Sequence, residues 1–180
     1  AAATEPSEQH LFRIPLLGGS PQQLTREPGY YAASFGKSGS VYVRQAMSLT
    51  SVPKLTVHRV ERSQSQLQTG PGTEVDPSAG ELASVAVAPP YLPKVEIAQV
   101  GPQAIRVALI RPRNFVPGRK YPVLVDVYGG PHHTQVMAVG GRYLMDQWLA
   151  DHGFIVLAAD GRGTPFRGTT WEHAIAGNFG

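Results

Sequence analysis

Two short apolar runs with a helical stretch between them constrain the fold of this chain most strongly. The runs are 123–127 (VLVDV) and 154–159 (FIVLAA), and each is typical of a strand that is covered on both faces of a sheet. Between them, residues 141–151 repeat apolar side chains four positions apart, as at Leu144 and Trp148. This spacing predicts a helix with one apolar stripe and places Trp148 in the core. A strand, a helix and a strand in this order predict a right-handed parallel crossover.

The first third of the chain has a different pattern of short β segments separated by turns. Alternating or apolar segments occur at 10–14, 30–35, 40–45 and 55–60, with glycine-rich turns among them. Four such segments within about fifty residues predict an antiparallel meander. A meander of this length also forms one blade of a β-propeller.

An irregular stretch, 64–93, separates the two patterns. A short helix over 79–88 is considered there, although Gly80 and several β-branched residues disfavour it. Prolines then stiffen the chain, and we place a domain boundary near residue 90. Beyond it, the segments 95–100 and 105–111 predict two further strands.

Composition excludes several classes of protein. The 180 residues suffice for one ordinary domain or for parts of two. The net charge of +3 comes without a block of five like charges, which excludes the basic arm of a nucleic-acid-binding protein. The absence of cysteine excludes disulfides, thiolate metal sites and a cysteine nucleophile. No apolar run approaches the roughly 18 residues of a membrane-spanning helix.

The adjacent His132 and His133 do not predict a metal site. Neighbouring side chains in a chain point in different directions, no third ligand lies at a usable spacing, and the HExxH motif is absent.

The most informative segment for chemistry is 126–132 (DVYGGPH), in which a strand leads directly into Tyr128, Gly129 and Gly130. Two glycines allow a sharp turn and a close approach of the backbone to a substrate. The loop after a central strand is also where α/β-hydrolases place a donor of the oxyanion hole. From the spacing alone, a plain tight turn with an exposed tyrosine is the favoured interpretation, because Gly-Gly-Pro turns are common.

Several segments together resemble the prolyl oligopeptidase family of serine peptidases, and in particular its dipeptidyl peptidase IV branch. Residues 122–131 (PVLVDVYGGP) resemble the strand and loop signature of the family, and 155–164 (IVLAADGRGT) resemble its next strand and turn. Residues 12–19 (FRIPLLGG) and 23–25 (QLT) are similar to the final propeller blades of these proteins. The resemblance implies an α/β fold, with residues 1–90 as the end of a β-propeller and 91–180 as the start of an α/β-hydrolase domain.

The resemblance also implies an activity and a set of site residues. The family releases dipeptides from peptide N-termini, with proline or alanine second, through an acyl-enzyme and without a cofactor. The loop tyrosine of the family donates its hydroxyl to the oxyanion, and this role falls on Tyr128. The residues expected to support the substrate loop are Gly129, Gly130, Arg142, Asp160 and Arg162, with Arg162 expected to pair with Asp160 or a neighbouring carboxylate.

The serine nucleophile of such an enzyme is not found in this sequence. There is no Gly-x-Ser-x-Gly motif, and the nearest segments, 18–22 and 36–40, lack the last glycine and lie in the β-rich part. In α/β-hydrolases the serine, the acid and the histidine follow later in the chain. We therefore expect an incomplete fragment that lacks the nucleophile and is inactive alone.

Other interpretations stay open within this resemblance. The chain could come from an acylaminoacyl peptidase, a prolyl tripeptidyl peptidase or an oligopeptidase, or from a non-catalytic binding protein that has lost its serine. The expected partners are a peptide substrate and the remainder of the same polypeptide, and a homodimer is an alternative state. The family suggests an exported bacterial protein, with a cytoplasmic location as the alternative.

Overall fold

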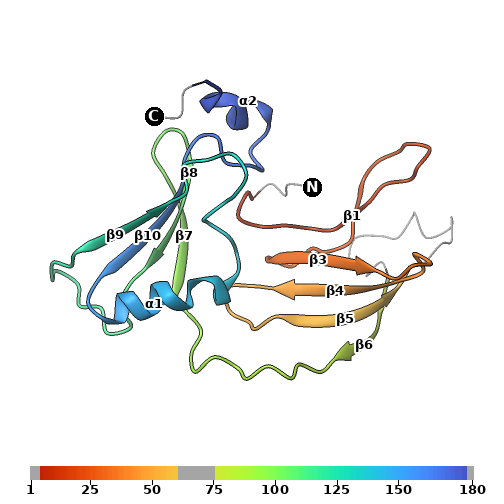
Figure 1. Cartoon of the computed structure of the whole chain (residues 1–180), viewed down its shortest axis with the longest axis horizontal. Coiled ribbons are helices and arrows are strands. Elements are labelled where there is room, and N and C mark those ends of the chain that lie inside the picture. The colour runs from red at the N-terminus through yellow and green to blue at the C-terminus, as the bar shows by residue number, and fades with distance from the viewer. Residues whose placement is uncertain (1–4, 61–75, 178–180) are drawn as a thin grey trace.

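The computed structural model describes residues 5–60 and 76–177 and consists mostly of antiparallel β-sheet with few helices. Two of its sheets have four strands each. Figure 1 shows these two sheets side by side, joined along the lower edge by an extended connection. A small hairpin of β1 (Phe12–Arg13) and β2 (Gln22–Gln23) precedes them. No helix in the described ranges is long and apolar enough to cross a membrane.

The first large sheet is an antiparallel meander with the strand order β3-β4-β5-β6. Its strands are β3 (Tyr30–Phe35), β4 (Val41–Met47), β5 (Lys54–Arg59) and β6 (Ser78–Leu82). Three of them confirm the expected β segments, and the arrangement is compatible with part of a β-propeller.

The fourth strand of the meander is not the one that the pattern predicted. The segment 10–14 contributes only β1, which pairs with β2, and the meander is completed by β6. The helix considered over 79–88 is therefore wrong in its first part. All five residues of β6 are exposed, so this strand has no buried face and shows no alternation of apolar and polar residues.

The side chain of His58 lies inside the meander. Its side chain is fully buried and stacks on Tyr42 at a centroid distance of 5.1 Å. Nε2 lies 2.7 Å from the Thr56 hydroxyl, and Nδ1 lies 2.6 Å from the carbonyl oxygen of Asp76. The imidazole is buried because both of its ring nitrogens have hydrogen-bond partners there.

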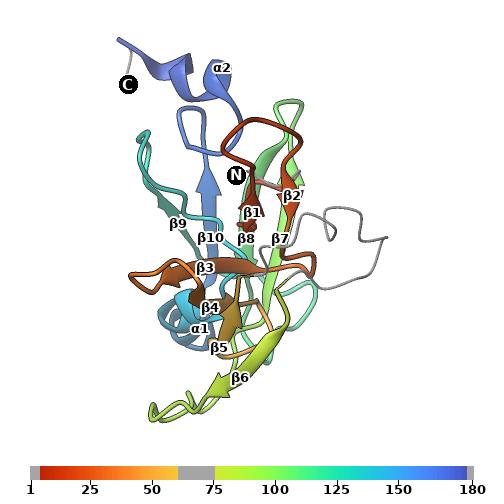
Figure 2. The same cartoon turned by 90° about the vertical axis from the view of Figure 1, so that its right-hand side faces the viewer.

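The second large sheet has the strand order β7-β8-β10-β9. Its strands are β7 (Val95–Val100), β8 (Ile105–Ile110), β9 (Val123–Val127) and β10 (Ile155–Asp160). Strand β10 is antiparallel to β8 and parallel to β9, which confirms the expected parallel pairing of the two apolar runs. Between β9 and β10 lie η2 (Gly140–Tyr143) and α1 (Leu144–Asp151), and α2 (Thr169–Glu172) and η3 (His173–Ile175) lie beyond the end of β10 (Figure 2).

Helix α1 packs on β10 and β8, but not with the predicted stripe. Tyr143, Gln147 and Ala150 are buried, whereas Trp148 is 50% exposed, so its assignment to the core is wrong. Gln147 turns inward because its amide is fully used there. Its Oε1 accepts a hydrogen bond from the backbone N–H of Lys94, and its Nε2 donates to the carbonyl of Arg111, at 2.8 and 3.0 Å.

Strand β9 differs from its prediction in burial. All five of its residues are exposed, although the apolar sequence is typical of a strand covered on both faces. Within the described ranges β9 pairs only with β10, at one edge of the sheet, and α1 packs on β10 and β8 instead.

The two large sheets are joined by polar contacts from the first residues of the described chain. Arg106 on β8 makes a two-pronged ion pair with Glu5, with Nε–Oε1 at 2.8 Å and Nη2–Oε2 at 2.9 Å. The backbone N–H of Ala138 donates to the carbonyl of Ser7 at 2.8 Å. The same N-terminal segment binds the meander, since the N–H of Tyr31 on β3 donates to the carbonyl of Gln9 at 2.9 Å, and it therefore links the loop that follows β9 to the meander.

Candidate functional site

Tyr128 is the first residue after β9 and begins the loop that leads to α1. Its side chain is 46% exposed, and its hydroxyl has no hydrogen-bond partner within residues 5–60 and 76–177. The ring meets that of His133 nearly at a right angle, with centroids 5.6 Å apart and an interplanar angle of 82°. The phenol is therefore held beside the loop with an uncommitted donor at its tip.

The two glycines after Tyr128 have different physical roles. Gly129 has a φ of 67°, in the left-handed region that disfavours most side chains. Gly130 makes room for the tyrosine itself, because a Cβ there would lie 2.7 Å from Cε1 of the Tyr128 ring. Gly129 therefore allows the chain to turn, and Gly130 allows the Tyr128 ring to lie close to the backbone.

Asp160, the last residue of β10, binds the middle of the same loop. Its two carboxylate oxygens accept hydrogen bonds from the backbone N–H groups of Gln135 and Val136, at 2.7 and 3.1 Å. Burial raises the pKa of this carboxyl, and the two hydrogen bonds only partly oppose that effect. Asp160 thus fixes the path of the loop through its backbone. Its expected role in supporting a substrate loop stays a prediction.

Arg142, in η2, closes the loop from the other side. Its Nε donates to the carbonyl of Gln135 at 3.1 Å, and its Nη2 donates to Oε1 of the same residue. The same Nη2 lies 3.2 Å from Nε2 of His133. Gln135 in turn donates to Oδ1 of Asp126 on β9 at 2.9 Å. One guanidinium therefore connects the ring beside Tyr128 with the strand that carries Tyr128.

Tyr143 is a loop anchor that the sequence did not indicate. It is almost fully buried, and its hydroxyl accepts the N–H of Met137 at 2.9 Å and lies 3.0 Å from the carbonyl of the same residue. Burial raises the pKa of Tyr143 to about 12, so the phenol is neutral at ordinary pH. Gln135 and His133 were equally unassigned, because a loop has no periodicity from which such contacts can be deduced.

Arg162 is placed differently from the other expected residues. Its side chain is exposed, and it takes part in none of the hydrogen bonds or ion pairs between described residues. The expected pair with Asp160 is absent because both carboxylate oxygens face the loop backbone instead. A supporting role for Arg162 remains a prediction.

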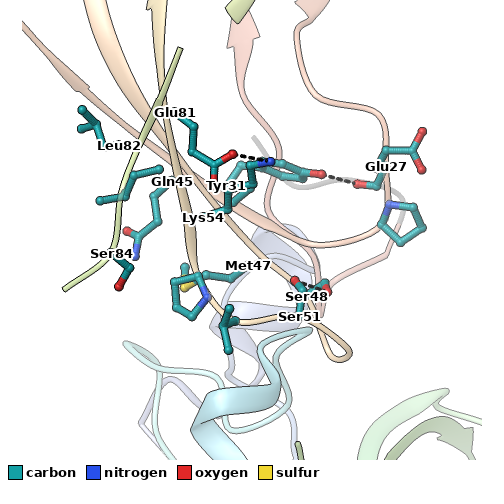
Figure 3. Close-up of a pocket in the computed structure, with 15 residues that line it drawn as sticks. Glu27, Tyr31, Gln45, Met47, Ser48, Ser51, Lys54, Glu81, Leu82 and Ser84 are labelled. Atoms are coloured by element: carbon teal, nitrogen blue, oxygen red, sulfur yellow. Dashed lines mark hydrogen bonds and ion pairs between the residues drawn. The ribbon is translucent and has the colours of Figure 1, made fainter. Parts of the chain in front are cut away.

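A separate pocket of about 580 Å³ lies on the meander, away from Tyr128 (Figure 3). Met47, Leu55 and Leu82 line it together with the ion pair of Lys54 and Glu81, whose Nζ–Oε2 distance is 2.7 Å. This pocket contains none of the residues that the sequence predicted for the site. In the described ranges, no group of three or more histidine, aspartate or glutamate side chains could hold a metal ion.

Comparison with known proteins gives a family and a set of named relatives. Residues 143–180 match the family described as the prolyl oligopeptidase family. The whole chain is similar to a probable dipeptidyl-aminopeptidase B of Coccidioides posadasii (strain C735), with 28% identity over 183 residues and 19% of that protein covered. It is also similar, over its whole length, to a probable dipeptidyl-aminopeptidase B of Emericella nidulans, with 31% identity over 184 residues and 20% of that protein covered. A dipeptidyl-aminopeptidase B of Aspergillus niger is 30% identical over 180 residues, which are 97% of this chain and 19% of the relative.

These matches confirm the resemblance to the prolyl oligopeptidase family, a family of hydrolases that act as peptidases. The relatives named above are dipeptidyl aminopeptidases, in agreement with the branch that the loop and turn motifs indicated. The chain spans about a fifth of the length of these relatives.

Proposed function

We propose that this chain is the part of a serine exopeptidase that supplies the oxyanion-binding tyrosine, Tyr128. The complete enzyme would release N-terminal dipeptides with proline or alanine in second place. The proposal is supported by the names of the relatives and by the position of Tyr128 at the carboxyl end of a parallel strand. Residues 1–90 would then belong to a β-propeller and 91–180 to an α/β-hydrolase domain.

The observation that carries the proposal is the state of the Tyr128 hydroxyl. It projects from the loop between the third strand of its sheet and the first α-helix, where α/β-hydrolases place an oxyanion donor. It is exposed and has no partner in the described part of the chain, so a substrate oxygen would not have to displace a hydrogen bond to another described residue. A phenol is a neutral donor that can bind an oxyanion without first losing a proton.

The reaction would proceed by acyl transfer. A serine supplied by the complete protein would attack the carbonyl carbon after the second residue of the peptide, and the carbonyl oxygen would gain the negative charge. Tyr128 and a backbone N–H would donate hydrogen bonds to that oxygen. Collapse of the intermediate would expel the shortened peptide as an amine, and water would then release the dipeptide from the serine. No cofactor takes part in these steps.

The test is Tyr128→Phe in the full-length gene product, with a chromogenic dipeptide amide that has proline second. Loss of an oxyanion donor is expected to lower kcat by about a hundred- to a thousand-fold. Tyr30→Phe, in β3 of the other sheet, is the matched control and should leave kcat unchanged. Near-normal turnover by folded Tyr128→Phe protein would refute the assigned role. Preference for an acylated amino acid, a tripeptide or an internal bond would instead identify one of the related peptidases.

A further inference from the structure

The ring of His133 contacts the Tyr128 ring from across the loop. The two rings meet edge to face, at 5.6 Å and 82°, an arrangement that aromatic pairs favour over face-to-face stacking. The ring also lies close to Gly130, where a Cβ would come within 2.7 Å of Cε1 and displace it. The direction of the Tyr128 hydroxyl therefore depends on where the His133 ring stands.

His133 is itself held, although it is exposed. Its Nε2 lies 3.2 Å from Nη2 of Arg142. A guanidinium can only donate, so Nε2 must accept, and the ring proton is placed on Nδ1. Arg142 cannot swing away easily, because its Nε and Nη2 also bind the carbonyl and the side-chain oxygen of Gln135. Multiple bonds from one planar group fix its orientation.

Gln135, which holds Arg142, is attached to the sheet at two points. The side chain of Gln135 donates to Asp126 on β9, and its backbone N–H donates to the buried carboxylate of Asp160 on β10. A continuous set of contacts therefore runs from the ends of two parallel strands through Gln135, Arg142 and His133 to the phenol. Within the described residues, none of these groups makes a hydrogen bond with the Tyr128 hydroxyl.

We propose that His133, held by Arg142, is a positioning residue that sets the direction of the Tyr128 hydroxyl toward the substrate oxygen. This inference rests on the proposed function, since it assigns a partner to the proposed oxyanion donor. His133 does not touch substrate in this role. It acts through the tyrosine, so its removal should matter only while that hydroxyl is present.

The main experiment is a double-mutant cycle in the full-length gene product, with the same chromogenic dipeptide amide. His133→Ala should lower kcat by about three- to ten-fold, the equivalent of one lost aromatic pair, with KM changed by less than about twofold. In the Tyr128→Phe background the same substitution should change kcat by less than about twofold, because the hydroxyl is already gone. Active-site titration with a serine-directed covalent label keeps a loss of folded enzyme apart from a loss of rate per site.

The neighbouring His132 provides the matched control. It is exposed and has no hydrogen bond or ion pair in the described part of the chain, and His132→Ala should leave kcat unchanged. His133→Phe retains a ring and should recover part of the lost kcat, whereas His133→Asn retains a polar group without the ring and should not. Equal losses from His133→Ala with and without the Tyr128 hydroxyl, equal effects at His132 and His133, or rescue by Asn alone would overturn the proposal. These outcomes leave the proposed function standing, which fails only if Tyr128→Phe itself retains normal turnover.

Discussion

At the scale of single residues, two opposing influences act on the pKa of Asp160. Burial of the carboxyl raises it, and the hydrogen bonds from two backbone N–H groups lower it. Burial is the larger influence and raises its pKa above the ordinary value of 3.8. In the pH interval from 3.8 up to the raised pKa, the folded protein binds more protons than the unfolded chain. The contribution of Asp160 to stability is therefore fully present below that interval and decreases as the pH rises through it.

We expect Asp160→Asn to destabilise the protein, because both oxygens of the carboxyl can accept an N–H whether the group is ionised or protonated, whereas the amide can accept only one and places its own NH₂ against the other. The cost of a hydrogen bond lost in this way is roughly 1–3 kcal/mol. The wild-type advantage in thermal midpoint should narrow as the pH is raised from just below 3.8 towards neutrality. Thermal unfolding of both full-length proteins, followed by near-ultraviolet circular dichroism at a series of pH values, measures this difference in midpoint.

Asp151 serves as the control with the opposite sign. Burial tends to raise its pKa, but the hydrogen bonds from Arg113 outweigh burial, and the pKa is lowered. Its contribution to stability is present above 3.8 and is lost as the pH falls through the lowered value. The advantage of wild type over Asp151→Asn should thus widen with rising pH. A gap at Asp160 that also widens would contradict the burial argument.

At the scale of elements, Gly140 is the point at which η2 meets the turn between β4 and β5. Its N–H donates to the carbonyl of Ser48 at 2.9 Å. A Cβ at this position would lie 2.4 Å from the carbonyl oxygen of Leu49, which is backbone and cannot move aside cheaply. The missing side chain therefore allows the helix that follows the Tyr128 loop to dock on the meander.

We predict that Gly140→Ala lowers the free energy of unfolding by about 1–3 kcal/mol, the usual cost of an overpacked contact. Gly141→Ala is the matched control, because a Cβ there meets nothing within 4 Å. Alanine should be neutral or slightly stabilising at that neighbouring position, since it is a better helix former than glycine. Thermal unfolding of both variants in the full-length protein tests the pair, and equal midpoints would show that the approach to Leu49 is not tight.

Pattern and length predicted most of the elements but not which side of each is buried. The parallel pairing of β9 with β10 follows from the two apolar runs. Burial on α1 could not be deduced, because Gln147 turns inward to satisfy backbone groups of two other segments. Strand β6 had no pattern to detect, since all of its residues are exposed.

At the scale of the whole molecule, the Tyr128 loop depends on segments that are distant in the sequence. Ser7 binds the backbone of Ala138, and Glu5 binds Arg106 across 101 positions. Periodicity reports only on neighbours within one element, so contacts of this kind cannot be predicted from it. Tyr128, Gly129 and Gly130 could be selected from a motif, whereas His133, Gln135 and Tyr143 could be found only when the loop was seen folded.

Strand β9 presents an exposed apolar surface through which the 180-residue chain can self-associate when it is produced alone. Its apolar side chains are uncovered, with Val123, Val125 and Val127 each more than half exposed. Its outer edge has no partner strand in the described part of the chain. An open, apolar edge strand is a template for pairing with other chains. We therefore predict that the isolated chain binds a hydrophobic dye and self-associates as its concentration rises, as measured by sedimentation velocity.

Substitution on β9 distinguishes self-association through this edge strand from nonspecific association through any exposed apolar side chain. Val125→Lys should reduce both dye binding and self-association, because a charge on an edge strand opposes pairing with a second copy. Val85→Lys removes an equally apolar, fully exposed side chain from the connection between the sheets and should have a much smaller effect. If the isolated chain stays monomeric without dye binding, or if both lysines act equally, then β9 is not the adhesive surface, and its apolar sequence needs another explanation.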